Sequence, residues 1–151
     1  MQAYTWKTGA RMNVDANIAG RMCEELANGK GLTAENLLDA NRPLNAPLHD
    51  AFEWDDGIAA EGYRQMQARH IINCLVLVQE DDDAPQVRAF FKVASPCYEQ
   101  TTTLLSIPER KDALLEQAER ELQIVKRKYA GLIQLANVIE AINAYFERKA
   151  V

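Results

Sequence analysis

Residues 47–72, PLHDAFEWDDGIAAEGYRQMQARHII, decide the fold that we predict for this chain. Asp55 and Asp56 precede a segment of helical periodicity, and an acidic side chain at the positive end of a helix dipole stabilises the helix start. We therefore predict a helix from about Gly57 to Ile72. Its apolar stripe consists of Ile58, Ala59, Tyr63, Met66 and Ile71. Its flanks carry the polar side chains Arg64, Gln65, Gln67 and Arg69.

The segment before this helix, residues 41–54 (NRPLNAPLHDAFEW), contains more large apolar side chains than is usual for a flexible loop. We predict that it packs onto the domain and that Leu48, Phe52 and Trp54 lock it in place. His49 and Glu53 then orient this entry segment or pair with Arg64, and either Asp55 or Asp56 caps the helix.

Two helices are expected before this segment. Apolar residues recur at three- and four-residue spacing from about Val14 to Asn28, and the glycines that follow stop that helix. Thr33 can cap a second, short helix that ends before Pro43. Residues 1–12 show no periodicity and suggest a docked arm or a disordered lead.

After Ile71 the pattern becomes extended. Residues 71–78 and 87–93 are rich in β-branched and aromatic side chains, and the polar stretch QEDDDAPQ separates them. We predict a β-hairpin here, followed by an irregular connection over 94–106.

A long C-terminal helix is predicted from Pro108 to about residue 148, since proline is favoured in a first helical turn. Its apolar residues alternate at three and four positions, which is the seam of a coiled coil. We expect self-association through this seam, with a dimer as the simplest oligomer and with Gly131 able to bend or split the helix. The seam includes Leu115, Leu122, Val125, Tyr129, Leu132 and Ile139.

The predicted fold class is therefore mainly α with one β-hairpin. Residues 1–95 form a winged-helix-like domain, and residues 96–151 form a connector and the long oligomerisation helix. The order helix, helix, helix, hairpin is that of a winged helix, whose third helix enters the DNA major groove. On this hypothesis Arg64, Gln65, Gln67 and Arg69 contact double-stranded DNA, because Arg suits guanine and phosphate and Gln suits adenine.

Two features oppose this interpretation. The acids at 80–83 lie at the proposed wing tip, where DNA phosphates repel them. The gap between the second and third helices is also longer than a helix-turn-helix requires. An alternative is a protein-interaction or assembly factor that uses the C-terminal stripe and the PLHDAFEW segment, without any nucleic acid.

A second alternative is a metal-dependent enzyme that uses His49 with Asp50, Glu53, Asp55 and Asp56. Helix caps and structural pairs explain these residues more simply, so we expect no metal, no cofactor and no catalytic residue. No phosphate-binding loop, nucleophile elbow or HExxH motif is present in the sequence.

Composition sets further bounds. The formal net charge of −5 counts against DNA binding unless basic residues cluster. No apolar run approaches the roughly 18 residues of a membrane span, and the N-terminus lacks a signal-peptide pattern, so we expect a cytoplasmic protein. The three cysteines form no CxxC pair, and we expect free thiols, with Cys23 and Cys74 buried.

The residues PLHDAFEWDDGIAAEGYRQMQAR, Pro47–Arg69, resemble a motif of short proteins encoded by bacteriophages and prophages, PLH-x2-FEWDD-x2-AA-x3-R-x3-AR. The resemblance implies a phage or prophage origin, a bacterial host cell and a phage or host protein as a possible partner. It implies no reaction, and it favours a regulator, a DNA-handling accessory or an assembly component over a metabolic enzyme.

Overall fold

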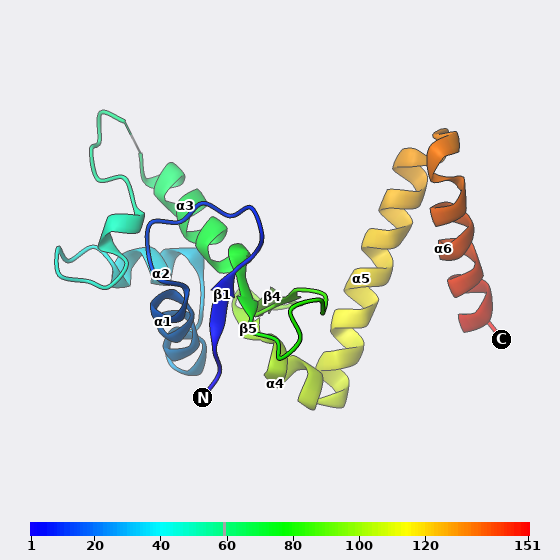
Figure 1. Cartoon of the computed structure of the whole chain (residues 1–151), viewed down its shortest axis with the longest axis horizontal. Helices are drawn as coiled ribbons and strands as arrows, with labels where there is room; N and C mark the ends of the chain where they lie inside the picture. The colour runs from blue at the N-terminus through cyan, green and yellow to red at the C-terminus, as the bar shows by residue number, and fades with distance from the viewer. Residues whose placement is uncertain (59) are drawn as a thin grey trace. The chain divides into compact units, whose positions relative to one another are not determined.

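The computed structural model describes residues 1–58 and 60–151 (Figure 1). These residues are mainly helical with small antiparallel sheets, as predicted at the level of fold class. They divide into two compact units, Met1–Ile107 and Pro108–Val151. The elements of the first unit are β1 Tyr4–Trp6, α1 Ala16–Asn28, α2 Ala34–Ala40, η1 His49–Ala51, α3 Glu61–Cys74, β2 Leu75–Leu77, β3 Val87–Arg88, β4 Phe90–Lys92, β5 Tyr98–Gln100 and α4 Thr101–Ser106. Those of the second unit are α5 Pro108–Tyr129, η2 Ile133–Leu135 and α6 Ala136–Lys149.

The second helix begins at its predicted cap, Thr33, and the first begins at Ala16, just after the predicted Val14, because Asp15 caps it. The Asp15 carboxylate accepts from the backbone nitrogens of Asn17 and Ile18 at 2.9 and 3.1 Å, and the Thr33 hydroxyl accepts from Asn36 at 2.9 Å. Each cap satisfies backbone donors that the first turn leaves without an intrahelical partner. The predictions for α1 and α2 are therefore confirmed.

The start of α3 differs from the prediction. The helix begins at Glu61, and its N-cap residue Ala60 makes no side-chain cap hydrogen bond among the described residues. The predicted caps are engaged elsewhere, since Asp55 Oδ1 accepts from Gly57 at 2.8 Å and Asp56 pairs with Arg64. Ala59, assigned above to the apolar stripe, lies outside the described residues.

The end of α3 corrects the predicted first strand. Residues 71–74 continue the helix, so that β2 is confined to Leu75–Leu77. The predicted hairpin is present as the shorter strands β2 and β3, which pair antiparallel with Val76 opposite Arg88. On the other edge of β2 lies β1, with Thr5 opposite Val76, so residues 4–6 are docked as a strand, which agrees with the docked arm and not with the disordered lead.

The second predicted strand is divided between two sheets. It breaks at Ala89, and β4 pairs with β5 instead of extending β3. The connection expected over 94–106 is thus β5 and α4, and the boundary between units falls at 107/108 rather than at 95/96.

The core of the first unit lies between α1, α2, α3 and the small sheets. Tyr4 stacks on Phe90 with ring centroids 5.9 Å apart, and both rings are buried. Close contact between Tyr4 and α1 requires a glycine at position 20, where an added Cβ would lie 2.2 Å from the tyrosine ring. Cys23 and Cys74 are buried free thiols, as expected.

The second unit is a helical hairpin rather than one long helix. α5 ends at Tyr129, and Leu132 N donates to Tyr129 O at 3.0 Å in the turn that contains Gly131. Of the two alternatives left open for residues 108–148, a continuous helix or one that is split at Gly131, the structure has the split. Across the hairpin the buried Glu119 of α5 accepts from Tyr145 and Lys149 of α6, each at 2.5 Å. Among the described residues, no helix is long and apolar enough to cross a membrane.

Candidate functional site

The entry segment before α3 is locked by stacking and by backbone hydrogen bonds, as predicted. The His49 and Trp54 rings stack with centroids 4.7 Å apart, and Trp54 Nε1 donates to the His49 carbonyl at 2.7 Å. Leu48 and Phe52 are buried, and Leu48 N donates to the side chain of buried Asn41 at 3.0 Å. The segment is thus a structural support that holds the N-terminal end of α3.

The acids of this segment have structural partners. Glu53 Oε1 accepts from Asp55 N at 3.0 Å, and His49 Nδ1 lies 3.0 Å from the Asn41 carbonyl oxygen. Within residues 1–58 and 60–151, no three His, Cys, Asp or Glu side chains are grouped so that they could hold a metal ion.

The four side chains that we predicted to contact DNA have separate environments. Arg64 is only 6% exposed, since its guanidinium pairs with Asp56 and lies over the Trp54 ring. Gln67 Oε1 accepts from Glu53 N at 3.1 Å. Gln65 is half-buried, and Arg69 is exposed. The expectation of an outward Arg64 is thus corrected, because the FEWDD motif itself encloses this cation.

Beside Arg69 lies a groove of about 580 Å³ between α3 and the segment 11–13. It contains two arginines and a histidine, together with exposed Tyr63 and Met66. No carboxylate is among the described residues that line it. These residues are Arg11, Met12, Asn13, Ala51, Tyr63, Met66, Gln67, Arg69, His70, Ile71 and Asn73.

A second groove of about 380 Å³ shares Asn73 with the first. Its described lining again holds cations and no carboxylate: Lys7, Asn73, Val76, Gln86 and Arg88. We call the two grooves together the basic track. Lys7 joins the track because β1 pairs with β2, which places Lys7 N 2.9 Å from the Cys74 carbonyl oxygen.

Two amide side chains of the track are oriented so that their nitrogens can donate hydrogen bonds to a ligand. Arg88 donates to Asn73 Oδ1, and Glu53 N donates to Gln67 Oε1. The oxygens of both amides are therefore engaged, and their nitrogens remain as donors. Donors beside guanidinium groups, in a groove without carboxylates, suit an anionic ligand.

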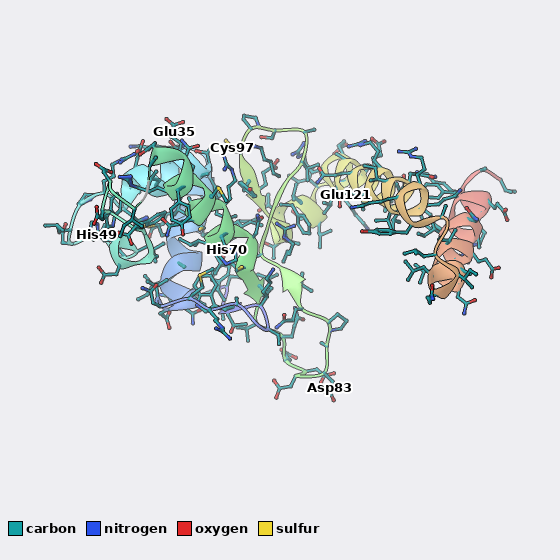
Figure 2. The ribbon with its side chains drawn as sticks, turned by 90° about the horizontal axis from the view of Figure 1, so that it is seen from above. Glu35, His49, His70, Asp83, Cys97 and Glu121 are labelled. Atoms are coloured by element: carbon teal, nitrogen blue, oxygen red, sulfur yellow. The ribbon has the colours of Figure 1, made fainter. Side chains whose placement is uncertain are left out.

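The charge of the track contrasts with that of the unit that contains it. Residues 1–107 hold 9 Lys and Arg against 15 Asp and Glu. Four of the nine cations line the track, and none of the fifteen acids does so among the described residues. Figure 2 shows His70 over the body of this unit and Asp83 far from it, at the outer end of the acidic loop. Asp81 and Asp82 of this loop line a third groove that shares Val76 and Gln86 with the track, so the acids adjoin one end of the track and lie outside its lining.

Sequence reasoning found Arg69 and missed Lys7, Arg11 and Arg88. These three residues lie in segments without a recognisable motif, and only the pairing of β1, β2 and β3 brings Lys7 and Arg88 beside α3. No local signal identifies them, because the track is built from contacts between distant segments.

The predicted oligomerisation residues are divided by the break at Gly131. On α5, Leu115, Leu122 and Val125 are 47%, 38% and 40% exposed, and Tyr129 is half-buried. Leu132 lies in the turn and is exposed, and Ile139 on α6 is half-buried.

A search of protein-family models, curated proteins and solved structures finds no match to this chain.

Proposed function

We propose that this protein is a non-enzymatic DNA-binding protein that holds the phosphate backbone along the basic track. The observation that carries the proposal is the segregation of charge: Lys7, Arg11, Arg69 and Arg88 line two adjoining grooves in a unit with an excess of acids. What governs DNA binding is the clustering of charge rather than its sum.

The residue types of the track suit phosphate oxygens. Arginine offers planar pairs of donors to phosphate, and lysine acts as a point charge. The amide nitrogens of Asn73 and Gln67 add neutral donors, which commonly contact the backbone of DNA. Contacts of this kind hold DNA without selecting a sequence. The half-exposed Gln65 is the remaining candidate for a base contact among the residues predicted earlier.

In this proposal DNA binds along the basic track, and not in the way that it docks on a winged helix. In that docking the hairpin tip approaches the phosphates, and here the tip carries Glu80, Asp81, Asp82 and Asp83. In this proposal the duplex lies along α3 and Arg11, because Asp81 and Asp82 adjoin the other end of the track, at Val76 and Gln86. The resemblance of Pro47–Arg69 to phage proteins adds a biological setting, in which a small regulator or DNA-handling accessory is a natural role.

The experiment measures binding of a fluorescent DNA duplex by anisotropy over a series of salt concentrations. Each phosphate neutralised by a cation contributes about −0.9 to the slope of log K against log salt. The double variant Arg11→Ala/Arg69→Ala should bind more weakly and reduce that slope by about 1.8. The matched control is Arg21→Ala/Lys30→Ala, which removes the same charge from exposed positions outside the track.

The control should leave the slope unchanged. Equal losses in the two double variants would mean that overall charge, and not the track, is responsible. If the wild-type protein binds no duplex even at low salt, the proposal is wrong.

A second function, binding of an acidic protein segment, is favoured by the exposed Tyr63 and Met66 in the same groove. Aromatic, Met and Arg side chains are enriched in protein interfaces. The variant Tyr63→Ala/Met66→Ala separates the two functions. This variant keeps every cation of the track, so its DNA binding should have the same salt slope as that of the wild-type protein. It should bind an acidic protein segment more weakly if that partner inserts an apolar side chain into the groove.

A further inference from the structure

Helix α5 carries an apolar stripe in solvent. Leu115, Ala118, Leu122, Val125 and Tyr129 recur at alternating steps of three and four residues, the spacing of a coiled-coil seam. Leucine and valine on this stripe are about two-fifths exposed or more. Such a continuous stripe is a contact surface for another helix.

The hairpin partner α6 contacts α5 at residues outside the stripe. The contact includes Glu119, which is buried and bonded to Tyr145 and Lys149. In residues 108–151, all of them described, the buried side chains are Glu119 and Ile142. A two-helix unit with so little apolar burial lacks a core of its own, because short helices need packing for stability.

Charge along α5 selects both the partner and its direction. Residues 109–121 hold five acids against three bases, whereas residues 122–129 hold Lys126, Arg127, Lys128 and no acid. A second copy in parallel would place the three cations beside the same three cations. A second copy in the antiparallel direction places them beside the acid-rich segment and also opposes the two helix dipoles.

We propose that the occupant of the α5 stripe is a second copy of this chain, paired with α5 antiparallel, so that two hairpins form a four-helix bundle. A twofold axis between Leu122 and Val125 sets Leu122 against Val125 of the partner subunit. It also sets small Ala118 against Tyr129 of the partner subunit. Glu121 then lies beside Lys128 of the partner subunit, which is an attractive pair on the flank of the seam.

The first test is the mass of the full chain in solution by sedimentation equilibrium. The wild-type protein should have the mass of two chains, and Leu122→Glu should have the mass of one, because a carboxylate enters the seam. The matched control, Ile133→Glu, adds the same charge at an exposed apolar position of η2 outside the stripe and should remain dimeric. Circular dichroism checks that both variants retain their helices. A monomeric wild-type protein overturns the proposal.

The second test reads the direction of pairing. In a Cys97→Ser background, Ala118→Cys and Tyr129→Cys chains are mixed and oxidised. Antiparallel pairing predicts a disulfide between the two different chains and none in Ala118→Cys alone, since those positions are 11 residues apart along the axis, about 16 Å. A disulfide in Ala118→Cys alone would show parallel pairing and would overturn the proposed direction. Neither result depends on DNA binding.

Discussion

The guanidinium carbon of Arg64 lies 5.6 Å from the centroid of the Trp54 ring, whereas Arg69, five residues further along α3, is exposed. Arg64 is further paired with Asp56, which is itself 85% exposed. Two arginines of one helix thus have different tasks: Arg64 joins the entry segment to α3, and Arg69 faces the basic track.

Arg64→Ala should reduce the free energy of unfolding by about 1–3 kcal/mol, because it removes a desolvated cation–π contact and its packing. The pair with Asp56 adds little, since that carboxylate stays in water. Arg64→Lys should lose less, because it retains the charge but not the planar stacking group. Urea denaturation measures both. Arg69→Ala, the exposed counterpart, should change the free energy by less than about 0.5 kcal/mol, and a larger loss there would contradict this division of roles.

Gly20→Ala should destabilise the protein by about 1–3 kcal/mol, the usual cost of overpacking a core. The new methyl group would lie 2.2 Å from the Tyr4 ring, which stacks on Phe90 and has little room to move. The matched control is Gly62→Ala in α3, where a Cβ meets no atom within 4 Å. That variant should be stabilised by about 0.5 kcal/mol, because alanine has the higher helix propensity. Thermal unfolding of the two variants gives the comparison, and similar losses in both would mean that Tyr4 does not fill this space.

Stability should fall as the pH rises above about 9. Burial raises the pKa of the Cys23 thiol to about 12, whereas an unfolded thiol ionises near 8.5. Between these values the unfolded chain releases a proton that the folded chain retains, so the loss approaches about 1.4 kcal/mol per pH unit. Burial, and then the hydrogen bond to Glu24, also raise the pKa of Tyr4, which adds to the loss above about pH 10.

Urea denaturation at a series of pH values measures this dependence. Cys23→Ala should have a flatter profile between about pH 8.5 and 10, where cysteine titrates in the unfolded chain and tyrosine does not. An unchanged profile in Cys23→Ala would assign the alkaline loss to other groups.

Acid should loosen the α5–α6 hairpin through Glu119. Hydrogen bonds from Lys149, and then from Tyr145, lower the pKa of this carboxyl group. A lowered pKa contributes stability above the unfolded value, and that contribution is lost as the pH falls through the folded value. Glu119→Gln should reproduce the loosening at neutral pH, seen as a loss of helical circular dichroism on mild heating. Glu147→Gln on exposed α6 is the control, and it should behave as the wild-type protein does.

Local signals predicted the elements that depend on nearby residues. Thr33 caps α2 within three residues of itself, so the N-terminal boundary of α2 was predicted from the sequence, whereas the Asp15 cap of α1 was not identified. The packing of Leu48 and Phe52 was predictable for a similar reason, since large apolar side chains recur in a proline-containing segment. The start of α3 was not, because Asp56 pairs with Arg64 eight residues away and Asp55 with Gly57.

The sequence by itself determined the mainly helical class, the first two helices, the packed entry segment and the apolar stripe of α5, since periodicity and caps act over a few residues. Only the tertiary structure decided that residues 4–6 form a strand, that the C-terminal helix turns back after Tyr129 and that Arg64 is enclosed. It also decided the basic track, in which Lys7, Arg69 and Arg88 come from three separate elements. Strand pairing and charge clustering depend on which distant segments meet, and no periodicity along the chain encodes that choice.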